Sequence, residues 1–564
     1  MKHLKTIAAA FLAISMAGCS QDQVGPDTPT PPEDGFYSTI SFKLPTTRST
    51  HKEGDEIGQE YENKIGSILV VLATKTEGAY AADQYKFLTF AQNDAPISSD
   101  NNTKYTITFQ DKTTLYAHAN SKVSVFAYCN PSKEFVDKIR GLAVNATFTD
   151  EICSTNVENT WKENGFLMTS VDEASITLPS ESELKNTYNT PTNPFHLGDI
   201  PVIRTASRFD FRDSSKDAIN HVDGLPALTY RILDTESPET VKPEVAKITL
   251  TRVTMFNQSN KFYFLPRTRT VGTTSTTEFL PGVAGMELNH IVTPTDKNFT
   301  FSLTKDTKLD VTSTNYKGEA DDFGYQWKSL TEILDGTQDN DSEWNKTTDG
   351  ESTSTKDPNR TGYYIWRYTT ENTWEEAFTS NEDMIKNSTG FIFEANIVVN
   401  TENAPADYKP GVDVMYCFNN RLYPNAKAIK AAYDLAPVSA LATAFEKAFE
   451  VKSDGSVAPK NGTDGKPDYA GVEEAGFIVY HPTEDGKYPC YYFAFNTHND
   501  DGDVTQQGDM EYATVRNNVY KLAVKNIKKF GTFTPPTNIE DWDTYFDLNV
   551  LIKPWVVRVN DFEF

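Results

Sequence analysis

The chain has 564 residues, enough for two or three domains, and a formal net charge of −26. This acidity excludes nucleic acid and anionic membrane surfaces as electrostatic partners. Runs rich in β-branched and aromatic residues dominate the chain and predict an all-β protein.

The first nineteen residues have the pattern of a lipoprotein export signal. Lys2 and Lys5 precede a short apolar core, Ile7–Ala17, which is too short to span a membrane. Met16-Ala17-Gly18-Cys19 then forms a lipobox. We therefore expect Cys19 to receive a lipid such as palmitate, which would be the only attachment to the membrane.

A tether and a strand follow the signal. Gln21–Gly35 holds four prolines and no apolar run, which predicts an extended linker. Phe36–Leu44 alternates apolar and polar residues, which predicts a strand. Its apolar face consists of Phe36, Ile40, Phe42 and Leu44.

Arg48 follows this strand within a small polar segment, Pro45–Thr50. Such a segment favours proteolysis, although an arginine in a loop is also ordinary. Cleavage between Arg48 and Ser49 would separate the lipid and one strand from the rest. Residues 1–48 carry no net charge, so the cleaved chain would keep the full −26.

Further alternating or apolar runs predict the remaining strands. The clearest of them are Ile65–Ala73, Lys122–Cys129, Val202–Phe211, Lys247–Phe256, Gly390–Val399, Cys490–Thr497 and Asn518–Ile527. Lys261–Leu265 is expected to form a hairpin with Lys247–Phe256. Two insertions interrupt the strands: the polar segment Lys305–Arg360, and Asn425–Val451, which predicts two short helices separated at Pro437.

The C-terminal segment Tyr545–Phe564 is unusually apolar for a chain end. Its alternating apolar residues are Phe546, Leu548, Val550, Ile552, Trp555, Val557 and Val559. Pro554 cannot donate a ladder hydrogen bond, so we expect a bend or break there. The segment is either the last strand of its own sheet or a strand lent to a neighbouring molecule by β-strand addition.

Three motifs carry a resemblance to a known family. Val515-Arg516-Asn517-Asn518-Val519-Tyr520, followed by Gly531, matches a VRNNxY strand, and Leu548-Asn549-Val550 with Pro554-Trp555 matches a final strand pair. Arg204 with Ala206-Ser207-Arg208 resembles an R-x-x-A-R strand with Ser207 interposed. With the lipobox and Arg48, the chain resembles the Bacteroidales fimbrillins, the type V pilus subunits, and among them the minor-fimbrium type.

The resemblance implies two tandem transthyretin-like β-sandwich domains with short helical insertions. The expected divisions are 1–19 for the signal, 20–48 for the propeptide, 49–285 and 286–544 for the two domains, and 545–564 for a donor strand. The resemblance also implies an outer-membrane lipidated precursor that an arginine-specific protease cleaves after Arg48. Cleavage displaces Phe36–Leu44, and the donor strand of another copy, or of another pilus subunit, fills the groove.

The resemblance thus favours a structural stalk subunit of an extracellular fimbrium that mediates adhesion to host or bacterial surfaces. Two alternatives stay open: an anchored glycan- or host-binding lipoprotein, and a pilus tip adhesin. Neither alternative needs both Arg48 and a free C-terminal strand.

The sequence predicts no enzyme, no cofactor and no metal site. None of its eight histidines lies in a metal-binding pair, and nucleophile-elbow and phosphate-loop motifs are missing. The acidic runs Asp335–Glu343 and Asn499–Asp503 are solvated loops or calcium ligands, and solvated loops are favoured. Tyr363–Tyr368 is a packed strand or a sugar-stacking surface. Disulfides or buried thiols both remain open for Cys129, Cys153, Cys417 and Cys490.

Overall fold

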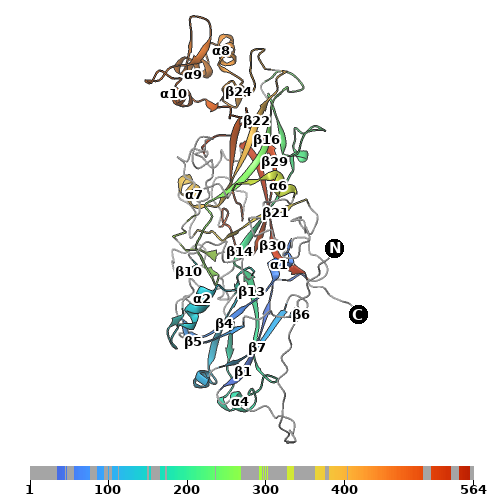
Figure 1. Cartoon of the computed structure of the whole chain (residues 1–564), viewed down its shortest axis with the longest axis vertical. Coiled ribbons are helices and arrows are strands. Elements are labelled where there is room, and N and C mark those ends of the chain that lie inside the picture. Colours follow the sequence, from blue (N-terminus) through green and yellow to red (C-terminus); the bar gives the residue numbers. More distant parts are fainter. Residues whose placement is uncertain are drawn as a thin grey trace, which may run out of the picture.

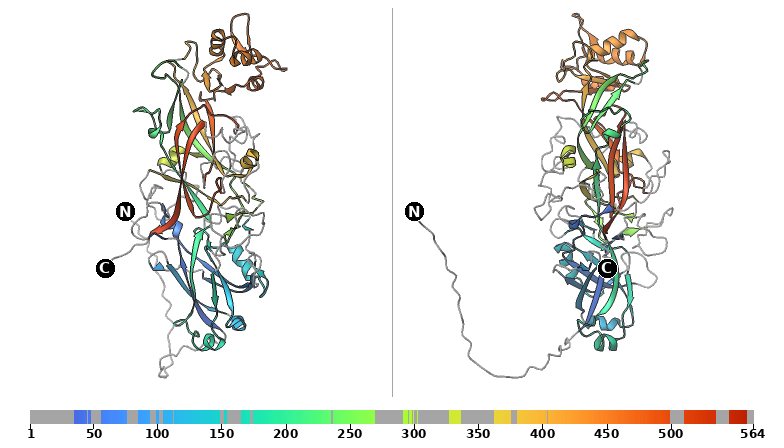
Figure 2. Two further views of the ribbon diagram at one scale, coloured as in Figure 1. Left: turned by 180° about the vertical axis from the view of Figure 1, so that it is seen from behind. Right: turned by 90° about the vertical axis from the view of Figure 1, so that its right-hand side faces the viewer.

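The structure is a computed structural model. It describes residues 35–44, 46–47, 56–75, 85–93, 99–100, 104–111, 113–148, 152–153, 165–171, 174–234, 237–268, 291–294, 296–297, 299, 302, 327–335, 362–374, 380–402, 404–498, 510–534 and 545–558. The strands form two bodies that follow one another along the long axis, with a small helical subdomain at one pole (Figure 1, Figure 2). The all-β prediction is confirmed.

The N-terminal body is a path of ten paired strands around one core. In spatial order they are β6 (Ser99–Asp100), β7 (Lys104–Asp111), β1 (Phe36–Lys43), β13 (Phe195–Arg204), β11 (Met168–Ser170), β8 (Lys122–Cys129), β4 (Ile68–Lys75), β5 (Tyr85–Asn93) and β9 (Thr147–Phe148), with β12 (Ala174–Thr177) on β8. Its short helical elements are α1 (Glu60–Asn63), η1 (Thr113–His118), α2 (Lys133–Arg140) and α4 (Glu181–Asn186).

Strand β13 connects the two parts of this path. Its first part pairs with β1 as far as Pro201, and its last part, Val202–Arg204, pairs with β11. Apolar side chains of β4 and β8 supply much of the core, and Ile68 to Ala73 are all buried. Continuous burial of this kind is typical of a strand covered on both faces.

The C-terminal body consists of two sheets that face each other. One sheet has the order β2 (Thr46–Thr47), β30 (Phe546–Arg558), β29 (Asn518–Ile527), β14 (Ala206–Arg212) and β21 (Tyr364–Thr370), with β3 (Glu56–Ile57) on β30. The other has the order β15 (Thr229–Leu233), β16 (Glu244–Phe256), β22 (Gly390–Val399) and β28 (Pro489–Phe495), with β20 (Lys328–Ser329) on β16. Phe209 of the first sheet packs edge-on against Phe391 of the second at a centroid distance of 5.4 Å.

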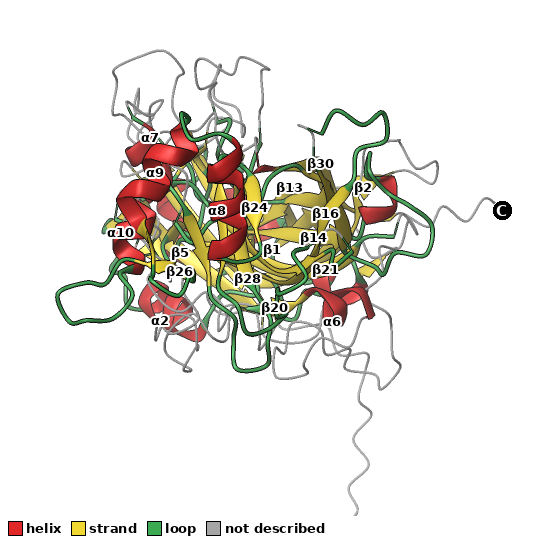
Figure 3. Ribbon diagram, turned by 90° about the horizontal axis from the view of Figure 1, so that it is seen from above, coloured by secondary structure: helices red, strands yellow, loops and turns green. Residues whose placement is uncertain are grey.

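A small subdomain with its own core caps the far pole (Figure 1). It contains β23 (Met415–Phe418), β24 (Arg421–Tyr423), α8 (Ala426–Leu435), α9 (Ala440–Ala448), β25 (Phe449–Val451), β26 (Val457–Pro459), α10 (Tyr469–Glu474) and β27 (Ile478–Tyr480). Pro437 lies between α8 and α9, as predicted. Figure 3 shows the three helices gathered on one side of the strands when the molecule is viewed along its long axis.

The remaining short elements lie around these bodies. They are β10 (Ile152–Cys153) paired with β17 (Phe262–Tyr263), β18 (Arg267–Thr268) paired with β19 (Ile291–Val292), η2 (Ser215–Asp217), α6 (Leu330–Asp335) and α7 (Asn381–Asn387). The expected hairpin of Lys261–Leu265 with Lys247–Phe256 is therefore wrong, because β17 pairs with β10. Most of 305–360 lies outside the described residues.

The structure places the boundary between the two bodies earlier than residue 285. The predicted strand Val202–Phe211 is divided at Thr205, whose backbone N–H and hydroxyl both donate to the carbonyl of Leu167. Before Thr205 the chain pairs within the N-terminal body, and after it β14 pairs with β21 and β29. The chain therefore crosses between bodies within one residue, and strands that we assigned to the N-terminal domain belong to the second.

Candidate assembly site

Strand β1 lies inside the N-terminal sheet. It pairs antiparallel with β7 from Phe36 opposite Asp111 to Lys43 opposite Lys104, and parallel with β13 on its other edge. The predicted apolar face is buried: Phe36, Ile40 and Phe42 are 0% exposed and Leu44 is 3% exposed. Four such side chains contribute roughly 6–12 kcal/mol of burial, so removing β1 would leave an unfavourable open groove.

The segment around the predicted cleavage site is described only on either side of it. Arg48, Ser49 and the lipidation residue Cys19 lie outside the described residues. The short strands β2, before Arg48, and β3, after it, both pair parallel with β30. Segments before and after Arg48 therefore meet the C-terminal strand.

Strand β30 is continuous through Pro554, so the expected break there is wrong. It pairs antiparallel with β29 from Ile527 opposite Phe546 to Asn518 opposite Pro554, and an irregularity occurs between Val524 and Asn526. The opposite edge of β30 is paired only at Trp555–Arg558, with β3 and β2, in the part of the chain that the structure describes. A proline is tolerated where an edge needs no donor.

The first part of β30 is packed within its own body. Phe546 is 2% exposed and lies against Phe393 and Tyr492 at centroid distances of 5.8 and 5.3 Å. Leu548 and Val550 pack on the same core, whereas Leu551 is 42% exposed. A strand that is lent to a neighbour contributes little to the core of its own subunit, so the burial of Phe546 argues against a donor role for this residue.

The other predicted donor residues are described less fully. Ile552, Trp555 and Val557 are defined as strand positions without a description of their side chains, and Val559 lies beyond the described residues. The structure therefore brings the displaced-strand residues together in one buried strand. It places the candidate donor residues along a second strand of the other body.

Two fully buried arginines bind α1 to the start of the C-terminal body. Arg204 donates from Nε to the carbonyl of Glu62, 3.0 Å away, and from Nη1 to Oδ1 of Asn517, 3.2 Å away. It also bonds the side chain of Asn63. Arg204 thus joins α1 of the N-terminal body to the loop before β29.

Arg208 forms a buried ion cluster with two carboxylates. Its Nη2 is 2.8 Å from Oδ2 of Asp210, and its Nη1 is 3.2 Å from Oε2 of Glu62. All three side chains are 0% exposed, and the hydroxyl of Tyr368 donates to Glu62 at 2.5 Å. Burial raises the pKa of Asp210 in spite of Arg208. Such clusters strongly penalise removal of one partner.

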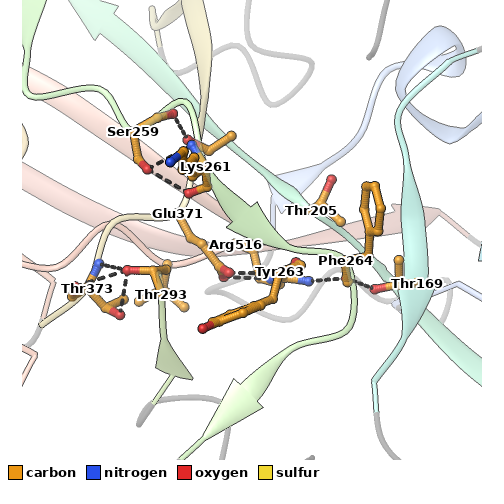
Figure 4. A network of polar contacts seen from close by, with 12 residues as sticks. Thr169, Thr205, Ser259, Lys261, Tyr263, Phe264, Thr293, Glu371, Thr373 and Arg516 are labelled. Atoms are coloured by element: carbon orange, nitrogen blue, oxygen red, sulfur yellow. Dashed lines mark hydrogen bonds and ion pairs between the residues drawn. The ribbon is translucent and has the colours of Figure 1, made fainter. Parts of the chain in front are cut away.

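A third buried arginine ties a loop of the C-terminal body onto the first (Figure 4). Arg516 contacts Glu371 through Nε at 2.6 Å and donates to the carbonyls of Tyr263 and Phe264 at 2.6 and 2.8 Å. The Phe264 carbonyl also accepts from the hydroxyl of Thr169 in the N-terminal body at 2.7 Å. The Phe264 ring lies 4.4 Å from that of Phe135.

The three arginines lie in the motifs that resemble fimbrillin sequences, but those motifs do not predict that the arginines form a junction between the two bodies. The sequence feature that could have predicted the junction is the position of three arginines in or beside apolar strands. A buried arginine requires acceptors, so these positions indicate a buried polar network. The interposed Ser207 is also buried, and its hydroxyl donates to the carbonyl of Val515 at 2.7 Å. The two quoted motifs therefore contact each other.

A steric constraint explains why glycine occupies position 531, which follows the VRNNxY motif. A Cβ added there would lie 2.6 Å from the carbonyl oxygen of Tyr491, closer than real contacts allow. The Gly531 carbonyl accepts a hydrogen bond from Tyr480 at 2.7 Å. Close backbone approach is therefore what this position requires.

Other sequence alternatives are resolved for the described residues. Cys129, Cys417 and Cys490 are free buried thiols, and burial raises the pKa of Cys417 and of Cys490 to about 12. The side chain of Cys153 lies outside the description. Trp366, at 3% exposed, and Tyr368 are core residues, which favours packing over sugar stacking.

The described chain contains no cluster of three metal-ligating side chains and no helix long and apolar enough to cross a membrane. Asp335 ends α6, whereas the rest of Asp335–Glu343 and all of Asn499–Asp503 fall outside the described residues. Calcium binding by these runs therefore stays untested.

His498 gives the stability of the C-terminal body a pH dependence. Its Nδ1 lies 2.9 Å from the hydroxyl of Tyr520, and burial lowers its pKa to about 4. Because the unfolded chain takes up this proton first, below about pH 6.5, the stability due to neutral His498 is lost as pH falls from there to about 4. The full loss is roughly 3 kcal/mol at ~1.4 kcal/mol per pKa unit.

We expect His498→Gln to flatten the dependence of unfolding free energy on pH in that interval. Denaturant unfolding between pH 7.5 and 4.5 measures it, and His196→Gln, at an exposed histidine, is the matched control. A wild-type curve parallel to that of His498→Gln would contradict the expectation.

Comparison with known proteins identifies the class of the C-terminal segment. Residues 486–561 match the family described as "Major fimbrial subunit protein type IV, Fimbrillin, C-terminal". The match contains β28, β29 and β30 up to its end, the strands that carry the VRNNxY motif and the final strand pair. The resemblance to fimbrillins is thereby confirmed for this segment. No curated protein matches the chain.

Several solved structures align with most of this chain at low sequence identity. A Parabacteroides distasonis protein to which cell adhesion is ascribed has a TM-score of 0.40 at 11% identity, with 93% of this chain and 99% of that chain covered. The fimbrilin fimA of Porphyromonas gingivalis has a TM-score of 0.38 at 12% identity, with coverages of 94% and 99%. The C-terminally truncated tip fimbrial protein Mfa3 of that organism has a TM-score of 0.33 at 10% identity, with coverages of 92% and 100%.

Proposed function

We propose that this chain is a stalk-type subunit of a surface pilus that contributes to adhesion. It is exported as a lipoprotein, cleaved after Arg48 and polymerised by strand exchange. The supporting observation is the position of β1. This strand is buried between β7 and β13, yet it is the first described strand and precedes Arg48, so one cut severs it from the rest of the N-terminal body.

Strand exchange follows from the energetics of that position. The groove left by β1 would expose apolar side chains and two unpaired strand edges. A strand with the alternating pattern of the C-terminal segment is suited to fill it, and head-to-tail filling generates a filament because the contact does not close on itself. The fimbrillin match of residues 486–561 supports the same assignment.

We expect Arg48→Ala to yield a longer, lipidated and unpolymerised precursor, whereas mature surface protein begins at Ser49. Mass determination of the N-terminus of surface-sheared material checks both forms. Lys43→Ala is a matched control, because it removes a nearby exposed charge without touching the cut. Polymer that retains Cys19 and its lipid would contradict cleavage and favour the anchored binding lipoprotein.

A further inference from the structure

The outer edge of β30 is held at one end by two short strands that come from opposite sides of Arg48. Thr46 and Thr47 of β2 pair parallel with Val557 and Arg558. Glu56 and Ile57 of β3 pair parallel with Trp555 and Val556. Cleavage after Arg48 would therefore separate the two strands that cover this end of β30.

The two short strands are tied to different parts of the molecule. Only Leu44 and Pro45 lie between β1 and β2, so β2 must move with β1 when β1 leaves. Only Gly58 and Gln59 lie between β3 and α1. The α1 side is fixed, because the Asn63 amide donates to the Gly58 carbonyl at 3.2 Å and Glu62 belongs to the buried cluster with Arg208.

We propose that the propeptide restrains the donor strand as well as filling the acceptor groove. In the precursor, β2 covers Val557–Arg558 and keeps the end of β30 in its own sheet. When β1 leaves after cleavage, it takes β2 with it, while β3 stays with α1. One cut thus opens the acceptor groove and also frees the end of β30. The groove and the donor strand therefore become available for strand exchange at the same time. This inference rests on the proposed strand exchange.

The strength of the contact suits such a restraint. A two-residue ladder offers about two hydrogen bonds, each of modest net strength in water. This is enough to keep an already adjacent strand in place, because no association entropy opposes the pairing. It is also weak enough to be lost once β1 departs.

Hydrogen–deuterium exchange on the uncleaved chain tests the proposal. Thr46→Pro with Thr47→Pro removes the N–H donors of β2, and Thr46→Ala with Thr47→Ala keeps them as the matched control. All variants carry Arg48→Ala to prevent cleavage. We expect exchange of the Val557 and Arg558 amides to accelerate roughly tenfold in the proline variant, and β1 amides to stay as protected as in the control.

Unchanged exchange at Val557 and Arg558 would overturn the proposal. Equal acceleration in β1 would also overturn it, because the prolines would then unseat the whole propeptide rather than release a separate contact. The measurement needs no filaments. If the filament experiments disprove strand exchange, the hydrogen–deuterium exchange result still shows independently whether β2 protects the end of β30.

Discussion

Arg208→Met is expected to lower the free energy of unfolding by about 3–5 kcal/mol. The substitution keeps much of the side-chain volume but leaves Glu62 and Asp210 buried near each other without the cation that contacts both. Denaturant unfolding at neutral pH measures the loss. Arg140→Met, at an exposed arginine on α2, is the matched control and should change stability by less than about 0.5 kcal/mol.

The same variant has a diagnostic pH dependence. Burial already raises the pKa of Asp210, and without Arg208 this pKa rises further, so the folded variant binds a proton that the unfolded chain does not. The destabilisation should therefore shrink as pH falls from 7 towards 5. An Arg208→Met protein as stable as Arg140→Met, or one whose deficit is independent of pH, would show that the cluster does not hold the junction together.

Truncation of β30 at two points is the second large effect that we expect. Deleting residues 551–564 removes the part beyond the packed positions and should leave a folded, cleavable monomer that forms no filaments. Deleting 546–564 also removes Phe546 from its contacts with Phe393 and Tyr492 and should cost a further 3–5 kcal/mol or so. Thermal unfolding together with electron microscopy of the cleaved proteins separates the two results.

The two truncations also divide the strand by role. Filaments formed by the 551–564 deletion would exclude this segment as donor. Aggregation of that shorter deletion, at a stability no better than that of the 546–564 deletion, would instead make the whole strand a structural part of its own sheet.

Local sequence patterns predicted the strands well where the two-residue alternation of apolar and polar side chains is clear. Asn518–Ile527 and Gly390–Val399 were predicted with the bounds that β29 and β22 have, because alternation and flanking polar residues define both ends. The burial of Phe36, Ile40, Phe42 and Leu44 followed from period two alone. The division of Asn425–Val451 at Pro437 followed from proline chemistry.

Features that depend on distant partners were missed. Val202–Phe211 reads as one strand, and only the bonds from Thr205 to Leu167 reveal the crossing between bodies. The parallel pairing of β1 with β13 joins residues more than 150 positions apart, and no local pattern specifies it. The sequence predicted a bend or break at Pro554, whereas β30 runs through this residue and pairs there with Asn518.

In the candidate assembly site, too, the sequence predicted the local features and missed those that depend on distant partners. Arg48 and the C-terminal alternation are visible in the sequence because cleavage and strand addition act on exposed or extended segments. The arginine junction was not predicted, since a buried Arg516 is recognised only through Glu371 and the carbonyls that surround it. Phe546 was assigned to the donor because alternation does not say which body buries a strand.

The most direct measurement of the central claim is the structure of the sheared filament by cryo-electron microscopy. The account predicts that β1 is absent and that a strand from the C-terminal segment of a neighbouring subunit lies between β7 and β13. Density for β1 in that position, continuous with the same subunit, would contradict assembly by strand exchange.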